Sequence, residues 1–282
     1  MDDRGNERRG RGRRDVTGRS DRAVERPRRE PPPAGPRRSA PADPRLPDDV
    51  RPEDLDRSVR AELRTLTPTN ADTVARYLVQ VGRLLDLDPD AAYANAMAAQ
   101  HRAGRVAVVR EVTGVAAYRS GRFAEALAEF RAARRLSGSA HLLPLMADSE
   151  RGLGRPERAL DLAASPEAGR LAAAERVELA IVTSGARRDL HQLDAAVLAL
   201  QTSDLGNEKA SWWPRLAYAY ADALEAAGRA DEAHSWLARA AAADTAGETD
   251  AAERLAEVEG VGEIVDLDED RGDESDPSAA GT

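Results

Sequence analysis

The four histidines are the first side chains to consider for chemistry, because imidazole is a common metal ligand and general base in proteins. They are His101, His141, His191 and His234. No two of them are four residues apart, so the i, i+4 pair that holds zinc on a helix does not occur. We therefore interpret them as surface or boundary residues and expect no metal site.

Other reactive motifs are incomplete. Ser184-Gly185 lacks the preceding glycine of a nucleophile elbow. Lys209 is the only lysine among 41 basic residues, and no glycine-rich phosphate loop ends at it. Residues 266–270 begin like a calcium-binding loop, but the loop glycine is missing and Pro277 stands where the final glutamate is needed. The sequence therefore predicts no enzyme and no cofactor.

The composition favours a helical protein in a reducing compartment. The chain of 282 residues contains no cysteine, which excludes disulfides and thiolate chemistry. Aromatic residues make up 4%, so the core must be built largely from Ala, Leu and Val, which suit closely packed helices. No stretch approaches the apolar length of a membrane span, and no apolar run of a signal peptide follows the first arginines. We expect a cytoplasmic protein that does not associate with membranes.

Charge divides the chain into three parts. Residues 1–50 contain 14 arginines and 10 acidic residues but no aromatic residue, whereas residues 245–282 contain 2 arginines and 13 acidic residues. Such segments bury too little apolar surface to offset the entropy of ordering. Residues 1–50 and 260–282 are therefore predicted to be disordered tails that flank a helical domain at 51–259.

The two tails suggest different contacts. The arginine- and glycine-rich residues 8–14 could bind RNA or DNA phosphates, although acidic residues are interspersed and no aromatic residue can stack on bases. Residues 263–270, EIVDLDED, could add as a strand to a partner's sheet, or the acidic tail could cover arginines of the chain itself. A purely solubilising tail is the simpler alternative.

Apolar residues recur at spacings of three and four through the middle of the chain, which is typical of amphipathic helices. Val74, Leu78 and Val81 share one helix face, and Asp88-Pro89 is a typical N-cap followed by a first helical residue. No strand, hairpin or β-α-β unit is predicted. Helices are expected at 52–66, 71–85, 89–103, 105–120, 122–136, 140–152, 156–164, 167–184, 189–201, 214–227, 230–243 and 249–259.

A turn dipeptide, Gly-Arg, precedes three similar helices, at Gly121, Gly154 and Gly228. The first two glycines are 33 residues apart and the last two are 74 apart; a turn near Arg188 would divide the longer interval into 34 and 40. A period of about 33 to 34 residues that contains two helices indicates a helical solenoid. An alanine-rich bundle that shows this spacing by chance is the alternative.

The residues at this spacing resemble the tetratricopeptide repeat (TPR) family. Its units have a small residue in the first helix, a turn glycine, and then alanine, a bulky apolar residue and alanine along the second helix. Small residues let two helices cross closely, and a residue such as Phe130 fills the wider space beside the crossing. The match is weak over 167–201. The chain also resembles an uncharacterised group of TPR-containing proteins from actinobacteria. The matching positions are Gly114, Gly121, Ala126, Phe130 and Ala133 in one unit, Ala147, Gly154 and Ala159 in the next, and Ala221, Gly228, Ala233, Leu237 and Ala240 in the last.

The resemblance implies a right-handed superhelix in which the first helix of each pair lines a concave groove. The side chains so placed carry both charges and two tyrosines, which suit an extended or helical peptide. Lysine and asparagine, with which some members of the family clamp acidic C-termini, are absent from these positions. The candidate groove residues are Glu111, Tyr118, Arg119, His141, Asp148, Arg151, Arg215, Tyr218, Asp222 and Glu225.

We therefore expect an all-α, TPR-like solenoid of about five helix pairs plus end helices, which serves as a cytoplasmic scaffold for protein–protein interaction. An RNA- or DNA-associated protein that binds through its N-terminal tail is one alternative. A structural helical domain of a larger assembly is another. The sequence identifies neither the partner protein nor the oligomeric state.

Overall fold

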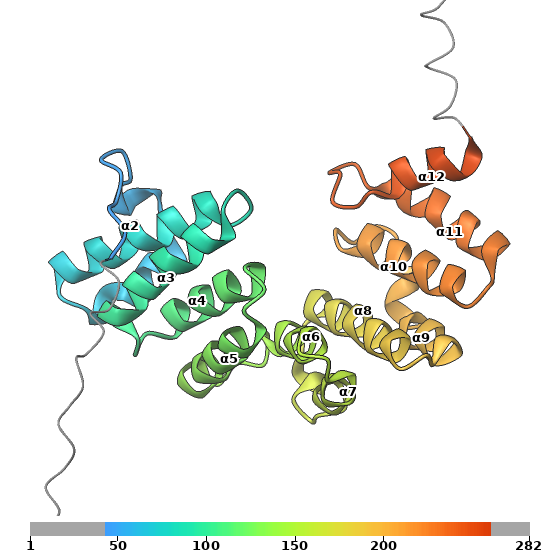
Figure 1. Cartoon of the computed structure of the whole chain (residues 1–282), viewed down its shortest axis with the longest axis horizontal. Helices are drawn as coiled ribbons and strands as arrows, with labels where there is room; N and C mark the ends of the chain where they lie inside the picture. The colour runs from blue at the N-terminus through green and yellow to red at the C-terminus, as the bar shows by residue number, and fades with distance from the viewer. Residues whose placement is uncertain (1–42, 261–282) are drawn as a thin grey trace, which may run out of the picture. The chain divides into compact units, whose positions relative to one another are not determined.

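The computed structural model describes residues 43–260 (Figure 1). Within this range the chain forms 12 α-helices and four short 3₁₀-helices and contains no strand, so the all-α prediction is confirmed. None of the helices in this range is long and apolar enough to cross a membrane. Residues 8–14 and 263–270, and with them the contacts predicted for the tails, lie outside the described residues.

The helices succeed one another with short connections. The 3₁₀-helices are Pro52–Asp54, Leu63–Thr65, Ala168–Arg170 and Ser203–Gly206. The α-helices are α1 (Arg57–Glu62), α2 (Pro68–Leu84), α3 (Pro89–Ala103), α4 (Ala107–Arg119), α5 (Phe123–Ser137), α6 (Leu143–Gly152), α7 (Pro156–Ala163), α8 (Ala173–Asp189), α9 (Leu193–Leu200), α10 (Trp213–Ala226), α11 (Ala230–Ala243) and α12 (Ala251–Glu259).

The packed part of the chain begins before Arg51, where the sequence places the end of the first tail. Val50 is buried, with 2% of its surface exposed, and its carbonyl accepts a hydrogen bond from Arg76 Nε at 2.8 Å. The Tyr77 hydroxyl donates to the Pro44 carbonyl at 3.2 Å. These bonds satisfy two backbone carbonyls of a segment that lies outside any helix. Residues 43–50 therefore belong to the helical domain.

Four tight turns join the helices of the pairs α4–α5, α6–α7, α8–α9 and α10–α11. The residue in the left-handed conformation is Gly121 (φ 73°), Gly154 (φ 69°), His191 (φ 57°) or Gly228 (φ 75°). In each turn the N–H of this left-handed residue donates to the carbonyl three residues earlier. The N–H of the residue that follows it donates to the carbonyl five residues earlier in the chain, as Arg122 does to Ala117. This is the Schellman motif, which satisfies the last carbonyls of a helix. The turn expected near Arg188 lies at His191, where histidine takes the place that glycine has in the other three turns.

Buried residues keep a fixed distance from each of these turns. A buried alanine stands five residues after every turn residue, and a buried small residue stands seven residues before it. The predicted repeat positions other than the turn glycines are all buried. The alanines are Ala126, Ala159, Ala196 and Ala233, and the small residues are Gly114, Ala147, Ser184 and Ala221.

The crossing of α4 and α5 shows why these positions are small. Phe130 is fully buried, and a Cβ added to Gly114 would lie only 2.6 Å from its ring. Ala126 and Ala133, on the same helix as Phe130, are also buried and pack in the same cluster. The absence of a side chain at Gly114 therefore makes the room that the Phe130 ring occupies.

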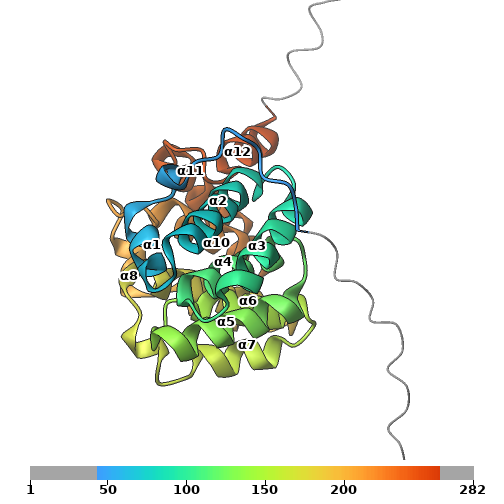
Figure 2. The same ribbon diagram turned by 90° about the vertical axis from the view of Figure 1, so that its left-hand side faces the viewer.

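Packing follows the order of the chain. Each helix from α2 to α12 contacts the next, and the first helices of successive pairs also contact one another, as α6 does α8 and α8 does α10. Figures 1 and 2 show α4 beside α5 and α6 beside α7. The core is accordingly divided into several apolar clusters along the chain instead of one central cluster.

The longest connection between helix pairs is the segment 201–212, which joins α9 to α10. The Trp213 indole N–H donates to the Leu205 carbonyl at 2.8 Å, and Glu208 forms an ion pair with Arg239 of α11 at 2.6 Å. The Arg239 guanidinium lies 3.8 Å from the centre of the Trp236 ring, a cation–π contact. These contacts fasten the segment to the helices on which it lies.

Candidate functional site

The faces of α4, α6, α8 and α10 form two adjoining hollows with volumes of about 820 and 400 Å³. Both hollows are lined by Ile181 and Arg215, so they adjoin, and we call their lining residues the groove. The larger hollow is lined by Val115, Tyr118, Arg119, His141, Pro144, Leu145, Asp148, Arg151, Ala174, Glu175, Glu178, Ile181, Val182 and Arg215. The smaller is lined by Ile181, Arg215, Tyr218, Ala219, Asp222, Glu248, Thr249 and Asp250.

Eight of the ten candidate residues named from the sequence line the groove. They are Tyr118, Arg119, His141, Asp148, Arg151, Arg215, Tyr218 and Asp222. The other two do not line it, but Glu111 contacts a lining residue and Glu225 contacts a residue of α12. Glu111 lies 3.0 Å from His141 Nε2, and Glu225 forms an ion pair with Arg254 at 2.5 Å.

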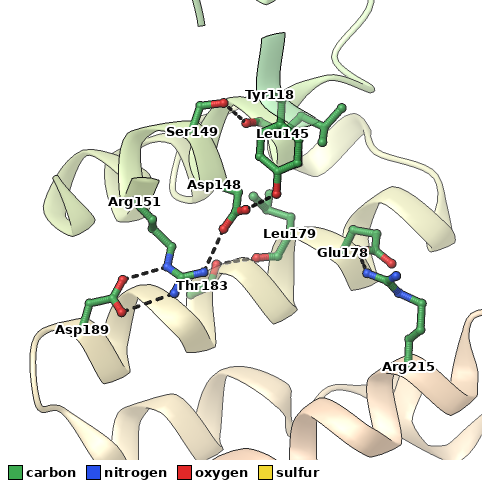
Figure 3. Close-up of polar contacts among 10 residues, drawn as sticks. All are labelled: Tyr118, Leu145, Asp148, Ser149, Arg151, Glu178, Leu179, Thr183, Asp189 and Arg215. Atoms are coloured by element: carbon green, nitrogen blue, oxygen red, sulfur yellow. Dashed lines mark hydrogen bonds and ion pairs between the residues drawn. The ribbon is translucent and has the colours of Figure 1, made fainter. Parts of the chain in front are cut away.

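A chain of polar contacts links α4, α6 and α8 (Figure 3). The Tyr118 hydroxyl donates a hydrogen bond to Asp148. Asp148 also accepts from Arg151 Nη1 at 2.8 Å, and Arg151 donates to both carboxylate oxygens of Asp189, at 2.8 and 3.3 Å. A guanidinium held by two carboxylates has a fixed orientation. These contacts therefore fix the side chains on one wall of the groove before any ligand arrives.

Burial and charge shift the proton affinities of this chain of contacts. Burial raises the pKa of the Tyr118 phenol, and the hydrogen bond to Asp148 raises it further, because the proton is needed for donation. Burial alone would lower the pKa of Arg151, but its hydrogen bonds and charge interactions with Asp189 and Asp148 raise it overall. Tyr118 is thus a neutral donor and Arg151 a permanent cation.

An ion pair connects the third and fourth helices of the groove. Arg215 Nη2 of α10 lies 2.9 Å from Glu178 Oε2 of α8, and both side chains are partly exposed (Figure 3). Exposed pairs of this kind contribute little to stability, on the order of 0–1 kcal/mol. Their charges therefore remain open to exchange for contacts with a ligand.

Between the polar groups the groove is apolar. Val115 of α4, Leu145 of α6, and Ile181 and Val182 of α8 all line the larger hollow, and each side chain is only partly buried. Covering such surface with another apolar side chain is favourable by about 25 cal/mol per Å². The groove therefore offers apolar contact area flanked by fixed polar groups, which is typical of ligand sites.

At the α10 end, the groove is bordered by a tyrosine among charged groups. The Tyr218 hydroxyl accepts a hydrogen bond from Arg254 Nη1 of α12 at 2.8 Å, and the Arg254 guanidinium lies 5.2 Å from the ring centre. Asp222 forms ion pairs with Arg188 and with Arg254, the latter at 3.6 Å. Burial, followed by hydrogen bonding to Asp250, raises the pKa of Tyr218. At this end of the groove, the guanidinium of Arg254 thus lies beside the aromatic ring of Tyr218.

The groove arginines are already paired with acidic residues. Arg119 pairs with Asp86 at 2.5 Å, and Arg151 and Arg215 are paired as described. Among the described residues, no ion pair involves the groove residues Glu175, Glu248 and Asp250. The lining contains three arginines and six acidic residues, so the groove carries an excess of negative charge.

Helix α8 supplies groove residues that the sequence did not single out. Ala174, Glu175, Glu178, Ile181 and Val182 all line the larger hollow. The repeat match was weak in this unit because its turn residue is histidine. Ala196 and Leu200, five and nine residues after His191, repeat the spacing of Ala126 and Phe130 after Gly121 and could have revealed the unit.

Gly185 of α8 is a further residue whose role the sequence did not reveal. A Cβ at this position would overlap the guanidinium of Arg151. Glycine therefore provides the surface on which Arg151 lies while it bonds to Asp148 and Asp189.

Within residues 43–260, no group of three or more His, Asp or Glu side chains is arranged so that it could hold a metal ion. The chemistry that the groove offers is hydrogen bonding, ion pairing and apolar contact. No protein-family model matches this chain, and a search of curated proteins finds no match either.

Proposed function

We propose that residues 43–260 form a TPR-like solenoid and that the protein is a scaffold that binds a peptide segment or helix of a partner protein in the groove. Recurrent Schellman turns, small residues at fixed distances from them, and contacts between the first helices of successive pairs support the solenoid. One observation carries the binding proposal. Candidate residues from separate helices, chosen for their place in the repeat, line two adjoining hollows.

The lining indicates what the partner segment contains. Partly buried Val115, Leu145 and Ile181 call for apolar side chains. Because the arginines are paired and acidic residues are in excess, the segment also carries lysine or arginine, in particular toward Glu248 and Asp250. The predicted acidic tail lacks charge complementarity with this lining, so we assign it no role in covering the groove.

Site-specific photo-crosslinking tests the proposal. A benzophenone amino acid replaces Leu145, which lines the larger hollow, in full-length protein expressed in its native cell. The matched control carries it at Leu136 of α5, which is 49% exposed and does not line the groove. We expect a nuclease-resistant protein adduct from position 145 and none from position 136, with the crosslink mapping to one short segment of the partner.

The proposal fails if both positions give the same adducts, because the contact would then be unrelated to the groove. It also fails if neither position gives a protein adduct. Circular dichroism of both variants shows whether the helices are retained, so that loss of an adduct cannot be attributed to unfolding.

A further inference from the structure

The described chain contains another hollow, of about 490 Å³, beside α1 and the start of α2. Its lining includes three arginines, Arg57, Arg60 and Arg64, and no acidic residue. The remaining lining residues are apolar: Ala61, Leu63, Leu66, Pro68 and Ala71. We call this the α1 hollow.

The three arginines form a positive cluster. Arg57 and Arg60 are three residues apart on α1, Arg64 follows in the 3₁₀-helix Leu63–Thr65, and all three line the same hollow. Within residues 43–260 none of them takes part in an ion pair, whereas Arg83 and Arg102, on the neighbouring helices, are paired with Asp49 and Asp43. In a protein with a formal net charge of −9, an unpaired cluster of this kind favours a negatively charged ligand.

The floor of the α1 hollow is anchored in the core. Leu63 is 1% exposed and belongs to the first apolar cluster, against which Leu66 and Ala71 pack. The floor therefore keeps its shape independently of the three arginines of the lining. A ligand that offers only phosphate groups would engage the arginines and leave this apolar floor uncovered.

We propose that the α1 hollow binds an acidic peptide segment that contains both aliphatic side chains and carboxylates. Carboxylates pair with the guanidinium groups, and aliphatic side chains cover the apolar floor. Residues 263–270 of this chain, EIVDLDED, have this composition. The site differs from the groove in charge as well as in place, since the groove has an excess of acidic residues.

Binding of a synthetic EIVDLDED peptide, followed by fluorescence anisotropy at low salt, tests this proposal. The receptor is the full chain with the five acidic residues of 263–270 changed to amides, so that its own segment does not compete. We expect saturable binding that weakens as salt screens the charges. A QIVNLNQN peptide, and one whose three aliphatic residues are replaced by serine, bind more weakly.

Two arginine variants of this receptor locate the site. R57Q/R60Q/R64Q should weaken binding roughly tenfold or more through the loss of three charge contacts. R105Q/R135Q/R158Q removes three exposed arginines that do not line the hollow, with the same change in net charge, and should bind as the parent does. All six side chains lie outside the buried core, so both variants should keep the helical circular dichroism of the parent.

Three outcomes overturn the proposal. The acidic peptide fails to bind, both arginine variants bind it equally, or the serine peptide binds as tightly as EIVDLDED, which would make the hollow a simple anion site. A single-stranded oligonucleotide that binds with the same arginine dependence, and more tightly than the peptide, would instead identify a nucleic-acid site. None of these results bears on the groove, because the crosslinking positions Leu145 and Leu136 do not line the α1 hollow.

Discussion

Gly114 and Gly82 both lie within helices, yet a methyl group added to each should have opposite effects. A Cβ at Gly114 would lie 2.6 Å from the Phe130 ring, whereas one at Gly82 would meet no atom within 4 Å. We expect G114A to lower the free energy of unfolding by about 1–3 kcal/mol through overpacking. G82A should raise it by up to about 1 kcal/mol, because alanine favours the helix. Urea denaturation measures both, and shifts of the same sign would contradict the close crossing at Gly114.

In the alkaline range, the titration of Tyr118 makes the stability of the folded protein depend on pH. Burial and the hydrogen bond to Asp148 raise its pKa in the folded state, whereas a tyrosine in an unfolded chain titrates near about 10. Between these two values the unfolded chain has lost the proton and the folded chain has kept it. The contribution of Tyr118 is therefore complete below pH of about 10 and decreases as pH rises toward the folded pKa.

Thermal melts of the wild type and Y118F at several pH values between about 9 and 11 check this sign. The variant should lose less stability over the interval, because its phenylalanine cannot titrate. The other tyrosines are present in both proteins and cancel in the comparison. Equal losses in the two proteins would show that the phenol of Tyr118 has no raised pKa.

At the scale of elements, the turn between α8 and α9 carries backbone strain. His191 has φ 57° in a position where the equivalent turns have glycine, and this conformation costs a residue with a Cβ about 1 kcal/mol. We expect H191G to raise the free energy of unfolding by up to about that amount. G154A, at the equivalent turn between α6 and α7, should lower it. Chemical denaturation of H191G and G154A measures both changes in the free energy of unfolding. A decrease in H191G would mean that the imidazole makes contacts that outweigh the strain.

Most elements could be predicted because their signals are local. Asp88 caps α3 by accepting from Ala91 N at 2.9 Å, at the residue where the sequence places the cap, and α5, expected at 122–136, spans Phe123–Ser137 and ends at Gly138 with φ 72°. Helix α8, expected at 167–184, instead spans Ala173–Asp189. Its expected start forms a 3₁₀ turn at Ala168–Arg170, two residues after Pro166, and its end extends to the His191 turn. Histidine in a left-handed conformation has no strong sequence signal.

The groove could be predicted only in part, because the side chains that pair in it are far apart in the sequence. Repeat spacing identifies which helix faces recur, and Tyr118, Asp148 and Arg215, chosen by that spacing, all line the larger hollow. The residues with which these side chains pair could not be predicted from the spacing. Asp189 pairs with Arg151 across 38 residues and Glu178 with Arg215 across 37. Pairings over such separations follow from how helices stack and leave no short-range pattern.

Because the helices of the domain pack in chain order, we expect a destabilising substitution to affect only the helices near it. Helices contact their neighbours in sequence, so stability should be close to a sum over pairs and their interfaces. In G114A, native-state hydrogen exchange should become faster in α4, α5 and the adjoining α3 and α6, and change little in α10 and α11. A uniform increase along residues 43–260 would indicate a single cooperative unit.

The segment that joins α9 to α10 also determines how this protein can be handled. Lys209 lies exposed within it and is the only lysine of the 282 residues. Apart from an α-amino group, amine-reactive dyes, biotin esters and resins therefore have a single side chain on which to react. A lysine-specific protease likewise has one cleavage site, between the helix pair α8–α9 and the helix pair α10–α11.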